Sequence, residues 1–104
     1  MVFEPHRFSR TRDLWQEFVD VLVQVDCLFL TKIYAASEES IAGVSSLLLA
    51  QQIASLGLAS VDYIDDKSDL PQHLLSLLSA GDIIIFQGAG ANAALIPAVM
   101  ESLV

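Results

Sequence analysis

The residues best suited to chemistry form a basic stretch, His6–Arg12, near the start of the 104-residue chain. Three arginines lie within six positions there: Arg7, Arg10 and Arg12. The planar guanidinium group matches carboxylate and phosphate oxygens with paired hydrogen bonds, so the stretch favours an anionic ligand. The alternative is a solvated helix start, whose arginines pair with nearby carboxylates, those of Glu4, Asp13 or Glu17.

The segment Tyr34–Glu39 carries a second set of candidate groups directly after an apolar run. Its alanines let a ligand approach the backbone, and Glu38 or Glu39 offers a carboxylate to an ammonium group. Taken as a bare pattern, however, the segment favours a solvated loop.

The third candidate is a glycine-rich turn, with Gly88 and Gly90 following a strongly apolar segment. It imitates the G-x-G-x-x-G/A fingerprint of dinucleotide-binding proteins, which also requires an acidic residue about 20 positions later on a following strand. The 104 residues hold no such strand after the glycines. The turn is therefore interpreted as a tight strand-to-helix connection at the ligand-binding edge of a sheet.

Other catalytic patterns are absent from the sequence. There is no P-loop and no G-x-S-x-G nucleophile turn. The only soft metal ligands are His6, His73 and Cys27, so we expect no metal site. No residue of this chain is predicted to be catalytic without groups from elsewhere.

Composition excludes several classes of protein. Lysine and arginine number 5 against 13 acidic residues, a net charge of −8, which repels nucleic acid. Hydrophobic residues make up 54%, too many for a disordered chain, yet no apolar run reaches the ~20 residues of a membrane span. A single cysteine is consistent with a cytoplasmic protein.

Hydrophobic periodicity divides the chain into alternating strands and helices. Strands are expected at 1–3, 27–30, 61–64 and 83–86, the last being the clearest. Helices are expected at 11–25, from about 46 to 56, at 69–80 and at 92–103. Ser9 or Thr11 is expected to cap the first helix, whose spacing places Trp15 in the core. Pro97 either kinks the last helix or marks a start near Ile96.

This order predicts an α/β fold, a three-layer Rossmann-like domain whose mainly parallel sheet has helices on both faces. The first strand has only three residues where five or six are typical, so we expect the first element to be truncated. All three candidate segments follow expected strands. They are therefore predicted to meet at the carboxyl edge of the sheet, where such folds bind ligands.

The segment Phe3–Leu14 resembles a stretch of the form F-Q-P-H-R-Y-[ST]-R-T-R-D, found in the C-terminal domain of the UDP-N-acetylmuramate–L-alanine ligases, which are Mur ligases. The segment Tyr34–Glu39 is similar to the family's Y-A-A-G-E, and Gln87–Gly90 to its Q-G-A-G. This chain departs from the pattern at three places: Glu4 replaces Gln, Ser37 replaces Gly, and Ala91-Asn92-Ala93 replaces Asn-x-Gly.

The resemblance implies that residues 1–104 form an N-terminally incomplete amino-acid-binding domain, without the UDP-sugar and ATP-binding domains. It implies an ATP- and Mg²⁺-dependent ligase that joins L-alanine to UDP-N-acetylmuramate through an acyl phosphate, in peptidoglycan synthesis and so in cell-wall formation, cell shape and division. The fragment alone is expected to be inactive and to hold no cofactor tightly. By resemblance, the substrate-binding residues are His6, Arg7, Arg10, Tyr34, Ala35 and Glu38.

The alternative hypothesis is a standalone Rossmann-like module that binds an anion or an amino acid without catalysis. It requires only the arginine stretch and the ligand edge of the sheet.

Overall fold

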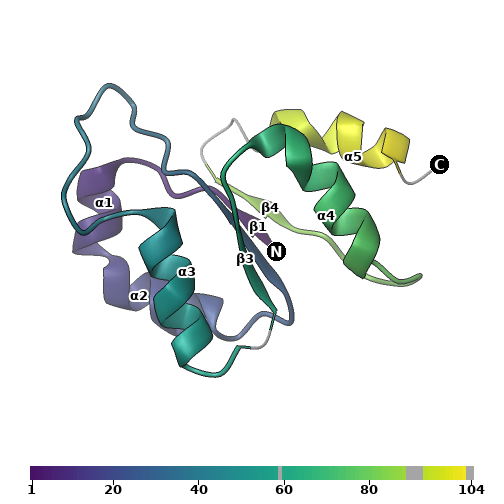
Figure 1. Ribbon diagram of the computed structural model, residues 1–104, viewed down its shortest axis with the longest axis horizontal. Helices are drawn as coiled ribbons and strands as arrows, with labels where there is room; N and C mark the ends of the chain where they lie inside the picture. The colour runs from purple at the N-terminus through teal and green to yellow at the C-terminus, as the bar shows by residue number, and fades with distance from the viewer. Residues whose placement is uncertain (59, 89–92, 103–104) are drawn as a thin grey trace.

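The computed structural model describes residues 1–58, 60–88 and 93–102 and contains one all-parallel sheet (Figure 1). Its four strands have the order β3-β2-β1-β4. Their bounds are β1 Val2–Phe3, β2 Leu28–Thr31, β3 Val61–Ile64 and β4 Phe86–Gln87. The sheet confirms the predicted α/β class and the parallel arrangement of the strands.

Helices cover both faces of the sheet, which confirms the three-layer arrangement (Figure 1). The α-helices are α1 Phe8–Asp13, α2 Trp15–Leu22, α3 Ser46–Ser55, α4 Leu70–Leu77 and α5 Ile96–Ser102. Short 3₁₀ turns precede the last two, η1 Lys67–Asp69 and η2 Ala93–Leu95. In the described residues no helix combines the length and the hydropathy needed to cross a bilayer.

Side chains alternate between two hydrophobic cores along the central strands. Phe3 and Leu30 face the core under α2 and α3, whereas Val2 and Phe29 face the core under α4 and α5. Because both faces are buried, the strands are apolar without polar alternation, which is why the sequence pattern revealed them. Trp15 packs half-buried at the rim of the first core and donates its indole N–H to Gln52 at 2.7 Å.

The predicted helix at 11–25 is wrong in its bounds. The chain forms two helices that meet at Leu14, which has φ −106° and ψ 16°. Neither predicted cap acts as one, because Thr11 is buried and its hydroxyl donates to the Arg7 carbonyl at 2.8 Å. Ser9 instead donates to Glu38 from a distant loop, a contact that periodicity does not reveal.

The predicted strand at 83–86 is also wrong, since β4 contains only Phe86 and Gln87. Val2 pairs with Phe86, so Ile83 and Ile84 extend past the first residue of β1 and form no ladder with it. Ile83 is 86% exposed. The apolar run is therefore real, but the sheet provides a strand neighbour for only its last part.

Two helices end or begin inside their predicted ranges. The predicted helix 69–80 is shorter, since α4 spans Leu70–Leu77 and Gly81 lies in a later turn. The last helix begins at Ile96, with Pro97 in its first turn, which confirms the second of the two alternatives for that proline. Its predicted ends, Asn92 and Leu103, lie outside the described residues.

The strand order creates a topological switch at β1. From β1 the chain moves outward through β2 to β3, and then returns to add β4 on the other side of β1. The helices following β1 and β4 consequently cover opposite faces of the sheet. In open α/β sheets ligands bind at the carboxyl edge beside such a point, which here means after Phe3 and after Gln87.

Candidate functional site

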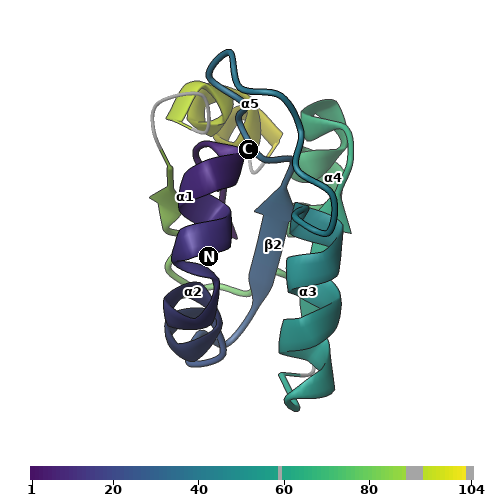
Figure 2. The same ribbon diagram turned by 90° about the vertical axis from the view of Figure 1, so that its left-hand side faces the viewer.

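The candidate site lies where the connections after β1 and β2 leave the carboxyl edge of the sheet. Residues 4–7 follow β1, α1 comes next, and the loop 32–45 follows β2. Figure 2 shows this loop at the end toward which β2 points, close to α1. The structure therefore brings the two sequence-predicted segments together at one edge, as the parallel order required.

His6 and Tyr34 form the centre of this site. Their backbones pair as a parallel bridge, and their rings stack with centroids 5.3 Å apart and planes 9° apart. The Arg7 amide donates to the Tyr34 carbonyl at 2.7 Å, and the Tyr34 amide donates to the Pro5 carbonyl at 2.8 Å. These bonds continue the β1–β2 pairing beyond the sheet and hold both rings in place.

One ring nitrogen of this pair has an unused bonding capacity. His6 Nδ1 is buried and has no hydrogen-bond partner among the described residues. A buried polar atom normally makes a hydrogen bond, so this nitrogen lacks a bond that a ligand or a water molecule would supply. Tyr34 is 48% exposed, so the stacked pair remains accessible from solvent.

Glu38 joins the β2 loop to the first turn of α1. Its carboxylate accepts from the Ser9 amide at 3.1 Å and from the Ser9 hydroxyl at 2.5 Å. The pKa of Glu38 is lowered most by the hydrogen bond from the Ser9 hydroxyl. Bonds from backbone amides and the nearby charge of Arg7 lower it further. The amino end of α1 thus already has an anion, and an incoming ammonium group would share Glu38 with Ser9.

The arginines divide into one paired and two unpaired side chains. Arg12 forms an ion pair with Asp13 at 2.9 Å, as the solvated-helix alternative expected for that residue. In the described part of the chain, neither Arg7 nor Arg10 joins an ion pair, and both side chains are exposed. Arg7 also has φ 72°, in the left-handed region, which is strained for a residue with a side chain.

Glu4 has a different partner from the one that the solvated-helix alternative expected, which was an arginine of the basic stretch. It is 2% exposed, follows β1 directly and forms an ion pair with Lys67 from the connection after β3. Its other oxygen, Oε1, is buried and has no partner in the described residues, and the same is true of the Thr31 hydroxyl. The departure from Gln at position 4 was a usable signal, because a buried acid requires a cation.

The glycine turn lies next to Glu4. The Glu4 amide donates to the Gln87 carbonyl at 2.9 Å, so Gly88 starts its turn at the switch between β1 and β4. Gly88 therefore lies directly after β4, and its role in a turn at the ligand edge stays a prediction. Gly90 lies outside the described residues.

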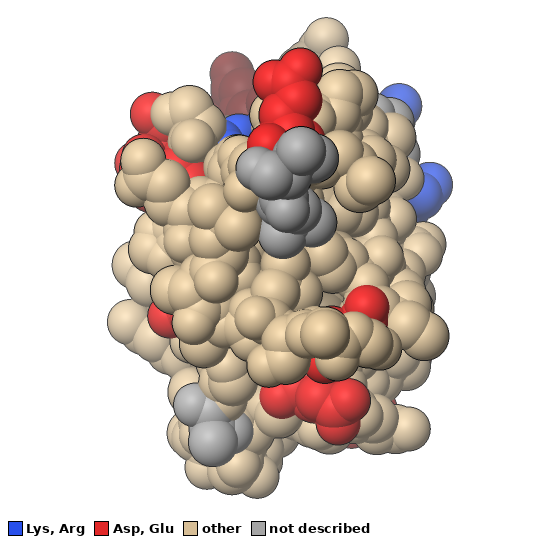
Figure 3. Space-filling model, turned by 90° about the vertical axis from the view of Figure 1, so that its right-hand side faces the viewer, with Lys and Arg blue, Asp and Glu red and all other residues tan. Residues whose placement is uncertain are grey.

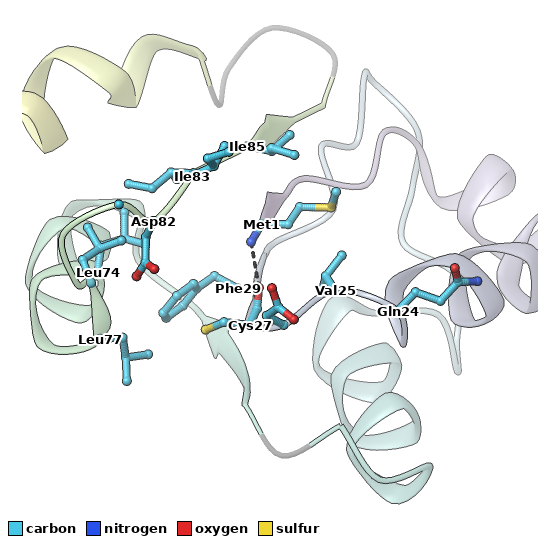
Figure 4. Close-up of a pocket in the computed structure, with 14 residues that line it drawn as sticks. Met1, Gln24, Val25, Cys27, Phe29, Leu74, Leu77, Asp82, Ile83 and Ile85 are labelled. Atoms are coloured by element: carbon cyan, nitrogen blue, oxygen red, sulfur yellow. Dashed lines mark hydrogen bonds between the residues drawn. The ribbon is translucent and has the colours of Figure 1, made fainter.

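The sheet is also hollowed away from its carboxyl edge. A hollow of about 520 Å³ lies at the opposite edge, beside Met1, Cys27 and Ile83 (Figure 4). It is lined mainly by aliphatic side chains and has none of the predicted site residues. Within the described ranges, no three side chains that ligate metals come together.

Several known proteins of one name are similar to this chain. A ligase named UDP-N-acetylmuramate–L-alanine ligase from Geobacter sulfurreducens is 48% identical over 90 residues, which are 86% of this chain and 20% of that protein. The ligase of the same name from Neisseria meningitidis serogroup C is 47% identical over 91 residues, 88% of this chain and 19% of that protein. This chain is homologous to one part of the UDP-N-acetylmuramate–L-alanine ligase family.

The family assignment agrees with the resemblance seen in the motifs. A third ligase of the same name, from Trichlorobacter lovleyi, is 48% identical over 90 residues. The chain spans about a fifth of the length of these relatives. No protein-family model matches it.

Proposed function

We propose that residues 1–104 are most of the amino-acid-binding C-terminal domain of a cytoplasmic UDP-N-acetylmuramate–L-alanine ligase, without the first segment of that domain. The observation that carries the proposal is the 47–48% identity to such ligases over 86–88% of the chain. The enzyme would join L-alanine to UDP-N-acetylmuramate in peptidoglycan synthesis. ATP, Mg²⁺ and the UDP sugar would be held mainly by domains outside these residues.

The proposed reaction has two steps. The carboxylate of UDP-N-acetylmuramate takes the γ-phosphoryl group of ATP, which releases ADP. The amine of L-alanine then attacks the resulting acyl phosphate, an amide bond forms, and phosphate leaves. Both steps develop negative charge on phosphoryl or carbonyl oxygens, so fixed positive groups nearby lower the barrier.

Arg7 and Arg10 are proposed to supply that positive charge. Both are exposed at the carboxyl edge, and neither is neutralised by a carboxylate in an ion pair among the described residues. They can therefore bind the carboxylate of L-alanine or the transferring phosphate with paired hydrogen bonds.

The loop after β2 is proposed to position the amino acid. Tyr34 stacks on His6, Ala35 follows it without bulk, and Glu38 holds the loop to Ser9. L-alanine is proposed to bind beside this loop.

The isolated chain is proposed to have no ligase activity and only weak affinity for alanine or nucleotide. Its site groups lie on an open sheet edge, and closure against the other domains would complete the site.

A chimera tests the proposed function. Residues 1–104 replace the homologous segment of the Geobacter sulfurreducens ligase, and product formation is measured from UDP-N-acetylmuramate, L-alanine and ATP. We expect alanine-dependent activity within about tenfold of the parent enzyme. A folded chimera that binds ATP and UDP-N-acetylmuramate but forms no product would overturn the proposal. If the isolated chain then bound phosphate or alanine at micromolar levels, the standalone binding module would take its place.

A further inference from the structure

The basic side chains of this chain gather at the carboxyl edge of the sheet. All five lie in segments that follow β1, β2 or β3. Figure 3 shows basic groups toward one end of a face that is otherwise largely uncharged, with acidic groups in separate patches. Three of the five form ion pairs, which join Arg12 to Asp13, Lys32 to Asp65 and Lys67 to Glu4. Arg7 and Arg10 join no ion pair among the described residues, and Arg7 differs from Arg10 in its left-handed backbone.

The backbone of Arg7 is strained. Its φ is 72° and its ψ is 140°, a region that glycine enters freely and that a Cβ atom makes costly. The chain turns at this residue from the bridge at His6 into α1, a turn that glycine would make at lower cost. An arginine at such a position indicates a use for its side chain that outweighs the strain.

Hydrogen bonds fix the peptide groups on both sides of the Arg7 Cα atom. The Arg7 amide donates to the Tyr34 carbonyl at 2.7 Å. The Arg7 carbonyl accepts twice from Thr11, from the amide at 3.1 Å and from the hydroxyl at 2.8 Å. The two flanking peptide planes determine φ and ψ, so these bonds also determine the direction in which the Arg7 side chain leaves the backbone.

The Thr11 hydroxyl makes the one of these bonds that depends on a side chain. The bond from the Thr11 amide is the ordinary helical bond to the carbonyl four positions earlier. A serine or threonine hydroxyl can donate to the same carbonyl, whereas valine has nearly the same shape and no donor. Thr11 is 0% exposed, so it cannot contact a ligand itself, whereas the Arg7 side chain is exposed. The shortest route from this hydroxyl to a ligand therefore passes through Arg7.

We propose that Thr11 is a positioning residue, whose hydroxyl holds the carbonyl of Arg7 and so keeps the Arg7 guanidinium group directed at the anionic group of the substrate. The inference rests on the proposed function, which gives Arg7 that anion to bind. It adds the residue that fixes Arg7 and a reason for the strained backbone. Every effect of the hydroxyl on turnover should therefore depend on the presence of the arginine.

A double-mutant cycle in the ligase chimera tests this dependence. Thr11→Val should lower kcat/KM for L-alanine by at least about fivefold, because Arg7 is less well directed, and Thr11→Ser should stay within about twofold because it keeps the donor. In a chimera that already carries Arg7→Ala, Thr11→Val should change kcat/KM by less than about twofold. A role in folding alone would lower activity equally in both backgrounds.

Thr31→Val is the matched control. Thr31 is also 0% exposed, but its hydroxyl has no hydrogen-bond partner in the part of the chain that the structure describes. The substitution should therefore leave kcat/KM for L-alanine within about twofold. Thr11→Ala replaces Thr11→Val in the cycle if the valine variant does not fold.

Two measurements on the 104-residue chain need no ligase activity. NMR couplings that report the sign of φ should show a positive φ at Arg7, and Thr11→Val should shift them toward negative values. Arg7→Gly should unfold about 3 °C or more above Arg7→Ala, because both variants lack the guanidinium group and only glycine adopts φ 72° without strain.

Three results would overturn the inference. One is an unchanged kcat/KM in Thr11→Val, and another is an equal loss in the chimeras with and without Arg7. The third is a negative φ at Arg7, or an Arg7→Gly variant no more stable than Arg7→Ala. An inactive parent chimera would instead count against the proposed function, and the two measurements on the 104-residue chain would still decide whether Thr11 holds Arg7.

Discussion

At the carboxyl edge of the sheet, charged and aromatic side chains join the connections that follow β1, β2 and β3. At the amino edge, the hollow between Cys27 and Ile85 has mainly aliphatic walls. The carboxyl edge contains the Glu4–Lys67 ion pair, the His6–Tyr34 stack and the bonds between Ser9 and Glu38. The same sheet therefore offers two different kinds of site.

The difference shows how function and folding are separated in this domain. Side-chain groups that could act on a ligand lie where the strands end, because each connection starts there and can project polar groups without disturbing the ladder. The amino edge offers mainly backbone and apolar surface. A change at the carboxyl edge should therefore alter charge balance or activity, whereas a change at the amino edge should act through packing.

The largest effect is expected from separating the Glu4–Lys67 pair. Lys67→Met leaves the Glu4 carboxylate buried without its cation, which should cost about 3–5 kcal/mol of unfolding free energy. The double variant Glu4→Gln/Lys67→Met removes both charges and should recover most of that loss. Urea unfolding followed by Trp15 fluorescence measures both. Equal free energies of unfolding for the two variants would show that an unpaired Glu4 charge does not destabilise the fold.

The next effect concerns turnover. Arg10→Ala in the chimera should lower kcat/KM for L-alanine by at least about tenfold, or about 1.4 kcal/mol of transition-state stabilisation, with unfolding unchanged. Arg12→Ala is the matched control, because Arg12 is already paired with Asp13 on the surface, and it should stay within about twofold. Similar losses in both variants would mean that general positive charge, and not the position of Arg10, is required.

A smaller effect is expected in the pH dependence at Glu38. Its pKa is lowered in the folded protein, so the carboxylate stabilises the fold above its ordinary pKa and loses that contribution as pH falls through the lowered value. Ser9→Ala removes the hydroxyl that is the first cause of this shift, so the Glu38 pKa should rise. NMR titration of the side chain measures it, with Ser76→Ala as a distant control. An unchanged pKa would mean that Ser9 does not hold the loop.

The smallest effect is expected at Ile83. In the 104-residue chain this side chain is 86% exposed, so Ile83→Ser should change the unfolding free energy by less than about 0.5 kcal/mol. Ile84→Ser is the matched comparison and should cost more, because Ile84 is partly buried against the core under α4 and α5. Urea unfolding measures both variants, and equal costs would show that exposure does not distinguish the two side chains.

Much of the candidate site could be predicted from the sequence, because its position depends only on the direction in which the strands run. Parallel strands end at the same edge, so segments following the strands at 1–3 and 27–30 had to meet, and His6 does contact Tyr34. The start of α1 at Phe8 could not be predicted in the same way. Glu38 caps that helix from 29 positions away, and apolar spacing gives no information about such a cap.

By itself, the sequence determined the types of element, their order and the burial of both faces of the sheet, since these follow from local periodicity and apolar content. Only the tertiary structure decided which polar groups met. Glu4 and Lys67 are 63 positions apart, and they pair because β3 and β1 flank β2 in the sheet. Ile83 remains exposed although it is strongly apolar, because burial of a strand requires a neighbour in register. Strand order and register belong to the assembled sheet, and no single segment contains them.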